Sequence, residues 1–61
     1  MINQIKQDLI KNKIKARVEI NKSDRHYFLS ITDEFMDIFR AFERIEDLKE
    51  YLYNTLKIKA R

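Results

Sequence analysis

Four acidic side chains near the C-terminal end form the clearest chemical pattern in the sequence. Their spacing of i, i+3, i+4 and i+7 places them on one side of an α-helix, where the carboxylates repel one another. Runs of like charge are most often a solvated face, and the alternative is a negative patch that meets a basic surface of a partner protein. The four residues are Glu43, Glu46, Asp47 and Glu50.

Aromatic residues accompany this acidic pattern. Tyr51 and Tyr53 follow it directly, and Phe35 and Met36 precede it. A chain of 61 residues has too small a core to bury all of these side chains. Aromatic and Met side chains left at a surface favour a protein interface, so we expect Tyr51 and Tyr53 to join the four acids in binding a protein partner. A homodimer would bury the same exposed aromatic and Met side chains without a second kind of partner.

A basic pattern lies in the first half of the chain. Lys13, Lys15 and Arg17 alternate with apolar residues, so a strand through them would place all three cations on one face. His26 and Phe28 would share this face on a neighbouring strand. An exposed aromatic ring among cations can stack on bases and contact phosphates, although three cations are few for such binding. Nucleic-acid binding through this sheet face is the alternative hypothesis for function.

Catalytic chemistry finds little support in the sequence. The chain has no Cys and no Gly, and His26 is its only imidazole. His26 and Ser30 would lie four residues apart on one strand, which is too far for a bond between a nucleophile and its base. Asp33, Glu34 and Asp37 offer oxygen ligands but lack the alternating acids and turn Gly of a calcium loop. We expect no catalytic residue, no metal site and no cofactor.

Periodicity predicts two helices and a hairpin that position these residues. Apolar side chains recur at helical spacing near both ends of the chain. Two stretches between them alternate between apolar and polar side chains, as half-buried strands do, and the residues that join these stretches are typical of a turn. The predicted elements are a helix over residues 2–11, strands over residues 13–21 and 25–32 with a turn at residues 21–24, and a helix over residues 45–57.

The same patterns predict which residues are buried and where the backbone turns. Val18 in the first strand and Leu52 in the last helix belong to the predicted core. Because the chain has no Gly, another tolerant residue must occupy any left-handed backbone position. Asn12, Asn21 and Asn54 are the natural candidates, with Asn12 placed to cap the first helix.

Residues 33–43 fit two structures. Their apolar side chains fall on one helical stripe, whereas like charges at (i, i+4) positions, such as Asp33 and Asp37, disfavour a continuous helix. Residues 38–42 also suit a short third strand, which we predict. The predicted fold is therefore an α+β domain of order α-β-β-β-α, with both helices on one face of a small antiparallel sheet. The alternative order is α-β-β-α-α.

The α-β-β-β-α order resembles that of the double-stranded-RNA-binding domain. Domains of that family begin their last helix with a Lys-rich segment that contacts phosphates. The corresponding segment here, residues 44–47, reads Arg-Ile-Glu-Asp. The resemblance is one of topology, and it does not assign the sequence to that family.

Length and charge limit the possible functions. The 61 residues make one domain of net charge +3, with +4 in residues 1–25, −4 in residues 26–50 and +3 in residues 51–61. The N-terminal segment lacks the apolar stretch of a signal peptide and no run is long enough to span a membrane, which together with the absence of Cys favours a cytoplasmic protein. We expect a small non-enzymatic regulator or inhibitor that binds another protein, as accessory proteins of phages and other mobile elements do.

Overall fold

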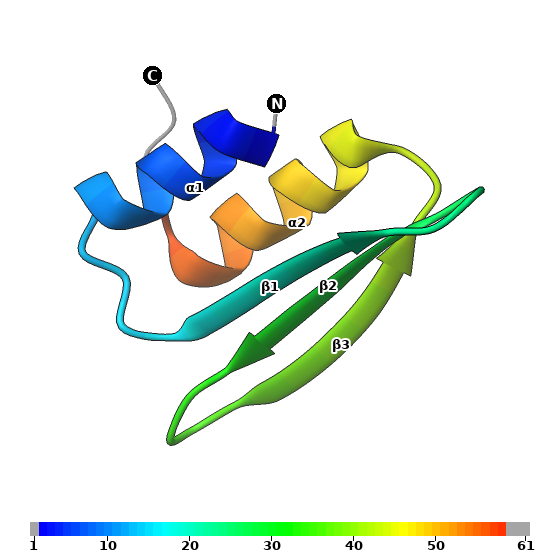
Figure 1. Cartoon of the computed structure of the whole chain (residues 1–61). Coiled ribbons are helices and arrows are strands. Elements are labelled where there is room, and N and C mark those ends of the chain that lie inside the picture. The colour runs from blue at the N-terminus through cyan, green and yellow to red at the C-terminus, as the bar shows by residue number, and fades with distance from the viewer. Residues whose placement is uncertain (1, 59–61) are drawn as a thin grey trace.

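The computed structural model describes residues 2–58, which form a layer of two helices on a three-stranded sheet (Figure 1). The element order is α-β-β-β-α, as predicted, and the alternative α-β-β-α-α is excluded. In the described range no helix is long and apolar enough to cross a membrane. The elements are α1 (Ile2–Lys11), β1 (Arg17–Lys22), β2 (Tyr27–Thr32), β3 (Asp37–Phe42) and α2 (Ile45–Leu56).

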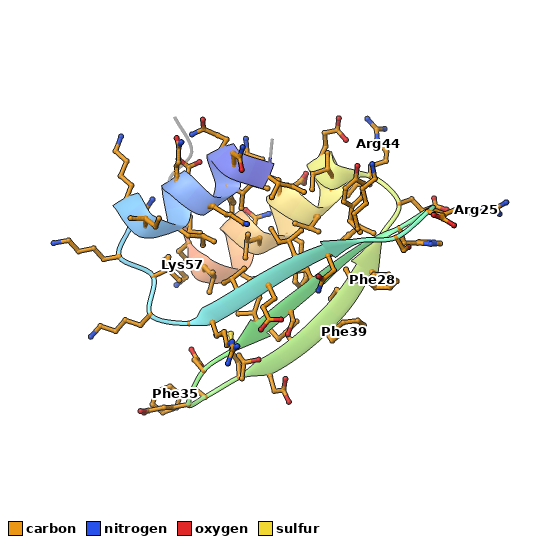
Figure 2. All side chains as sticks on the ribbon, viewed as in Figure 1. Arg25, Phe28, Phe35, Phe39, Arg44 and Lys57 are labelled. Atoms are coloured by element: carbon orange, nitrogen blue, oxygen red, sulfur yellow. The ribbon has the colours of Figure 1, made fainter. Side chains whose placement is uncertain are left out.

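The sheet is antiparallel, and its order β1-β2-β3 makes β2 the central strand. Side chains of one strand alternate between the two faces. Leu29 and Ile31 of β2 are fully buried, so the face that carries them is the core face. Phe28 lies on the opposite face, which we refer to as the outer face, and no helix covers that face (Figures 1 and 2).

Both helices pack on the core face of the sheet (Figure 1). Leu52, predicted to be buried, is fully enclosed, and Val18 is partly buried and packs against the same cluster. Side chains from both helices and from the central strand therefore make one continuous core. Its fully buried members are Ile5, Leu29, Ile31, Leu48 and Leu52.

The first strand begins later than the sequence predicts. β1 starts at Arg17, and residues 12–16 form a turn and irregular chain. Ile14 and Ala16 still pack against the core, so burial alternates through this segment without strand pairing. The prediction of a strand from residue 13 is wrong in its start, because period-two burial does not itself require a hydrogen-bonded neighbour.

Positive φ angles occur at two described residues, and neither is an asparagine. Lys13 has a φ of 54° and Lys57 a φ of 55°, so the predicted positions at Asn12, Asn21 and Asn54 are wrong. Asn12 does help to end α1, because its side-chain amide donates a hydrogen bond to the Asp8 carbonyl at 2.7 Å. The left-handed residue follows Asn12 by one position. At the end of α2, the backbone N–H of Lys57 donates to the Tyr53 carbonyl.

Asp33 closes the turn between β2 and β3. Its carboxylate accepts hydrogen bonds from the N–H groups of Phe35 and Met36, both at 2.7 Å. The backbone N–H of Asp33 also donates to the Met36 carbonyl at 3.0 Å, so the chain reverses direction here. The segment then pairs with β2 from Asp37, opposite Thr32, up to Phe42, which confirms the predicted third strand.

A buried polar cluster joins the two helices. The Tyr53 hydroxyl donates a hydrogen bond to Oδ2 of Asp8, and Nε2 of Gln4 donates to Oδ1 at 3.1 Å. Tyr53 is only 7 % exposed and Asp8 only 5 %. Burial, the hydrogen bond and the negative charge of Asp8 together raise the pKa of Tyr53 to about 12. The expectation that Tyr53 lies at a surface is wrong, because α1 covers it.

Truncation of the central core residue tests the placement of α2. We expect Leu52→Ala to lower the free energy of unfolding by about 2–5 kcal/mol, because a fully buried Leu leaves a cavity. Ile10→Ala is the matched control, since Ile10 is 78 % exposed and its loss should cost less than about 0.5 kcal/mol. Urea unfolding followed by circular dichroism measures both. Equal effects of the two substitutions would contradict the described core.

Alkaline pH tests the bond between Tyr53 and Asp8. Above pH 10.0 the unfolded chain loses the tyrosyl proton, whereas the folded chain keeps it up to about pH 12, so stability falls as pH rises through this window. The difference corresponds to at most about 3 kcal/mol. We expect Tyr53→Phe to be less stable than wild type below pH 10.0 and to show a shallower decline above it. Tyr51→Phe, which removes a partly exposed hydroxyl, should keep the wild-type decline in urea unfolding across this range.

Candidate functional site

The four predicted acids do not form one row on α2. Glu43 lies in the loop before the helix, and Glu46 forms an ion pair with Arg44, at 3.6 Å between Oε1 and Nε. Asp47 and Glu50 are on the helix and exposed. The single row expected from the spacing is wrong, because α2 begins after Glu43 and helical geometry does not extend to it.

Asp47 and Glu50 instead line a shallow hollow with Tyr51 and Asn54. We refer to these four residues as the acidic face of α2. The hollow has a volume of about 260 Å³, and the residues around it are spaced i, i+3, i+4 and i+7 within the helix. The first three were predicted from the sequence, whereas Asn54 was not. Its position one turn beyond Glu50 and Tyr51 is the signal that could have identified it.

Tyr51 joins the acidic face to β3. Its ring packs against that of Phe42, with the centroids 5.5 Å apart, and the guanidinium carbon of Arg40 lies 6.0 Å from its centroid. Nη1 of Arg40 also donates to the Phe39 carbonyl at 2.9 Å. One backbone carbonyl of the edge strand β3 is thereby hydrogen-bonded to a side chain. The ring of Tyr51 is thus supported on its β3 side and half-buried.

The two carboxylates of the acidic face, those of Asp47 and Glu50, form no ion pair within the described residues. Within residues 2–58 the ion pairs are Arg17–Glu19 and Arg44–Glu46, and neither includes Asp47 or Glu50. Asp47 lies in the first turn of α2, where the helix dipole favours a negative charge. Glu50 lies one turn further along, where it gains less from the dipole and faces Glu46 at the i−4 position.

The three cations of the predicted basic sheet face do not share a strand. Lys13 and Lys15 lie in the loop before β1, and only Arg17 belongs to the strand. Arg17 forms an ion pair with Glu19, at 3.0 Å between Nε and Oε2. His26 precedes β2, and its ring centroid is 6.3 Å from that of Phe28. The prediction that cations surround Phe28 on one strand-built face is wrong, because β1 begins only at Arg17.

An aromatic pair occupies the outer face. Phe28 and Phe39 stack with their centroids 5.8 Å apart and 14° between their planes, and they lie on the side of the sheet away from the helices (Figure 2). Phe39 is 61 % exposed. Phe39 was not among the predicted site residues, although strand alternation through residues 37–42 places it on the face opposite the partly buried Ile38 and Phe42.

Phe35 is the most exposed large apolar side chain in the described range, at 91 %. It lies at the tip of the turn between β2 and β3 (Figure 2). A hollow of about 440 Å³ lies beside it and is also lined by Lys15, Asp33 and Glu34. The acids of this turn were the candidate cation ligands, and within the described residues no three His, Cys, Asp or Glu side chains are grouped to hold a metal ion.

Ser23 and His26 meet through the backbone. The N–H of Ser23 donates to the His26 carbonyl at 2.8 Å, and the Ser23 hydroxyl bonds the His26 main chain at 3.3 Å. These bonds close the turn between β1 and β2. They involve the main chain of His26 and not its imidazole, so in these bonds the imidazole does not act as a base toward the Ser23 hydroxyl.

Comparison with known proteins adds no assignment. No protein-family model, curated protein or solved structure matches this chain. The candidate site therefore depends on its own geometry.

Neutralising one acid tests whether charge repulsion on the acidic face lowers the free energy of unfolding. We expect Glu50→Gln to stabilise the protein by about 0.2–0.5 kcal/mol at low salt, because it removes repulsion from Glu46 at the i−4 position. The gain should shrink at high salt, where exposed charges are screened. Asp24→Asn in the exposed turn between β1 and β2 is the control and should change little. A loss of stability in Glu50→Gln would show that this carboxylate supports the helix.

Proposed function

We propose that this protein binds another protein through the acidic face of α2, and that the partner presents a basic segment to it. One observation carries the proposal. In a single hollow of about 260 Å³, the carboxylates of Asp47 and Glu50 lie with a half-buried tyrosine ring, and neither carboxylate forms an ion pair within the described chain.

The side chains around this hollow suit a Lys or Arg of the partner. A cation that enters the hollow is attracted by two carboxylates, and charge-assisted hydrogen bonds to carboxylates are the stronger kind. The ring of Tyr51 adds apolar contact area, and Tyr side chains are enriched at protein interfaces. The amide of Asn54 can both donate and accept a hydrogen bond, which suits a partner's backbone.

We propose a non-enzymatic role as a regulator or inhibitor. Carboxylate, phenol and amide groups on an exposed helix are groups for recognition, and complementary charge steers association and excludes wrong partners. By covering a basic surface of its partner, the protein would block whatever anionic ligand that surface binds. A partner that itself binds nucleic acid fits this mode of action.

Charge reversal on the acidic face tests the proposal. We expect Asp47→Lys with Glu50→Lys to lose proteins that the immobilised wild type retains from a lysate of the source cells, and we expect this retention to weaken with rising salt. Retained proteins are identified by mass spectrometry. The control is Asp24→Lys with Glu34→Lys, which makes the same change in net charge at two exposed turn positions. It should retain what the wild type retains.

Two results would contradict the proposal. The first is an acidic-face variant that retains the same proteins as the wild type while circular dichroism shows both to be folded. The second is retention that disappears after nuclease treatment and is lost in Lys15→Glu with Arg17→Glu but not in the acidic-face variant. That second result would favour the nucleic-acid alternative.

A further inference from the structure

Charged residues at one end of the outer face are divided between its two sides. The register places Arg17 of β1, Thr32 of β2 and Asp37 of β3 in one row across the sheet. Because β1 and β3 are the edge strands, the cation and the anion lie on opposite edges of the same face. Beyond this row the division ends, because Lys15 of the loop before β1 lines one hollow with Asp33 and Glu34 of the turn before β3.

This division is self-complementary about one two-fold axis. When a second copy is laid face to face on the first, with the axis parallel to the strands, β1 of each copy lies over β3 of the other. Arg17 then meets Asp37 of the second copy, and symmetry makes the contact twice. An axis across the strands would instead lay Glu19 on Glu19 of the second copy, and like charges in an interface are unfavourable.

We propose that the outer face binds a second copy of this chain in this arrangement. The stacked rings of Phe28 on β2 and Phe39 on β3 supply apolar surface to the contact, and covering Phe39, now 61 % exposed, removes that surface from water. In this arrangement Phe39 lies opposite Glu19 of the second copy. Two reciprocal Arg17–Asp37 contacts set the orientation of the copies. The acidic face of α2 lies in the other layer of the molecule and stays free, so the two proposals are independent.

The dimer is expected to be weak. A face of three strands with six residues each measures about 15 Å by 20 Å, which is less than a standard protein interface buries on each partner. We expect a dissociation constant in roughly the micromolar to millimolar range. Sedimentation equilibrium from about 10 μM to about 1 mM covers that range.

Charge exchange between the edges gives the sharpest test. Arg17→Glu alone and Asp37→Arg alone each bring like charges together twice, and each should raise the dissociation constant roughly tenfold or more. In an equimolar mixture of the two variants, the heterodimer has opposite charges at both contacts. The mixture should therefore associate about as tightly as the wild type, which also shows that both variants are folded.

A second pair of variants tests the apolar part of the contact. Phe39→Ser should abolish dimerisation, whereas Ile10→Ser, an equally drastic change at an exposed position of α1, should leave it intact. A wild type that stays monomeric at about 1 mM would overturn the proposal and leave the outer face to another macromolecule. Failure of the mixed variants to associate, or equal effects of the Phe39 and Ile10 substitutions, would overturn it as well.

Discussion

The core of this protein lies on one side of its sheet, because both helices pack on the face that carries Leu29 and Ile31. A chain of 61 residues with no Cys has few other ways to enclose enough apolar surface to fold. Side chains reach this core from the helices and from the core face of the sheet. The outer face is left open for the same reason, with Phe28 and Phe39 on it.

The hydrogen bond from Tyr53 to Asp8 connects the two ends of the chain within that core. It also orients α2 about its axis. Leu48 and Leu52 face the sheet and Tyr53 faces α1, so Tyr51 must point towards β3, where Phe42 and Arg40 contact it. The rotation that buries Tyr53 is therefore the rotation that exposes the acidic face. The buried pair Tyr53–Asp8 thus helps to position the acidic face of α2, although neither residue belongs to that face.

The net positive charge of residues 1–25 and the net negative charge of residues 26–50 are distributed unevenly over the structure. Three of the seven basic residues within residues 1–25 lie in the loop before β1 and at its start, and five of the seven acidic residues within residues 26–50 lie in the turn before β3 and on α2. Two kinds of surface result from this division. The acidic face offers negative charge alone and suits a basic partner, whereas the outer face has Arg17 on one edge and Asp37 on the other, which we propose suits a copy of itself.

Much of the local structure was determined by the sequence itself. Apolar periodicity predicted both helices and the hairpin, and like-charged pairs such as Asp33 and Asp37 disfavoured a continuous helix over residues 33–43, where β3 forms. These predictions succeeded because they depend on neighbours within a few residues. The left-handed positions were not predictable in this way, since Lys13 and Lys57 have no special preference for positive φ.

Only the tertiary structure decided which residues share a surface. Tyr53 is buried because a helix 45 residues earlier in the chain brings Asp8 to its hydroxyl. β1 begins at Arg17 because pairing with β2 ends opposite Thr32, and this leaves Lys13 and Lys15 in a loop. Phe39 lies beside Phe28 because β3 pairs with β2 in one register. Each outcome depends on contacts between segments far apart in the sequence, where periodicity along the chain carries no information.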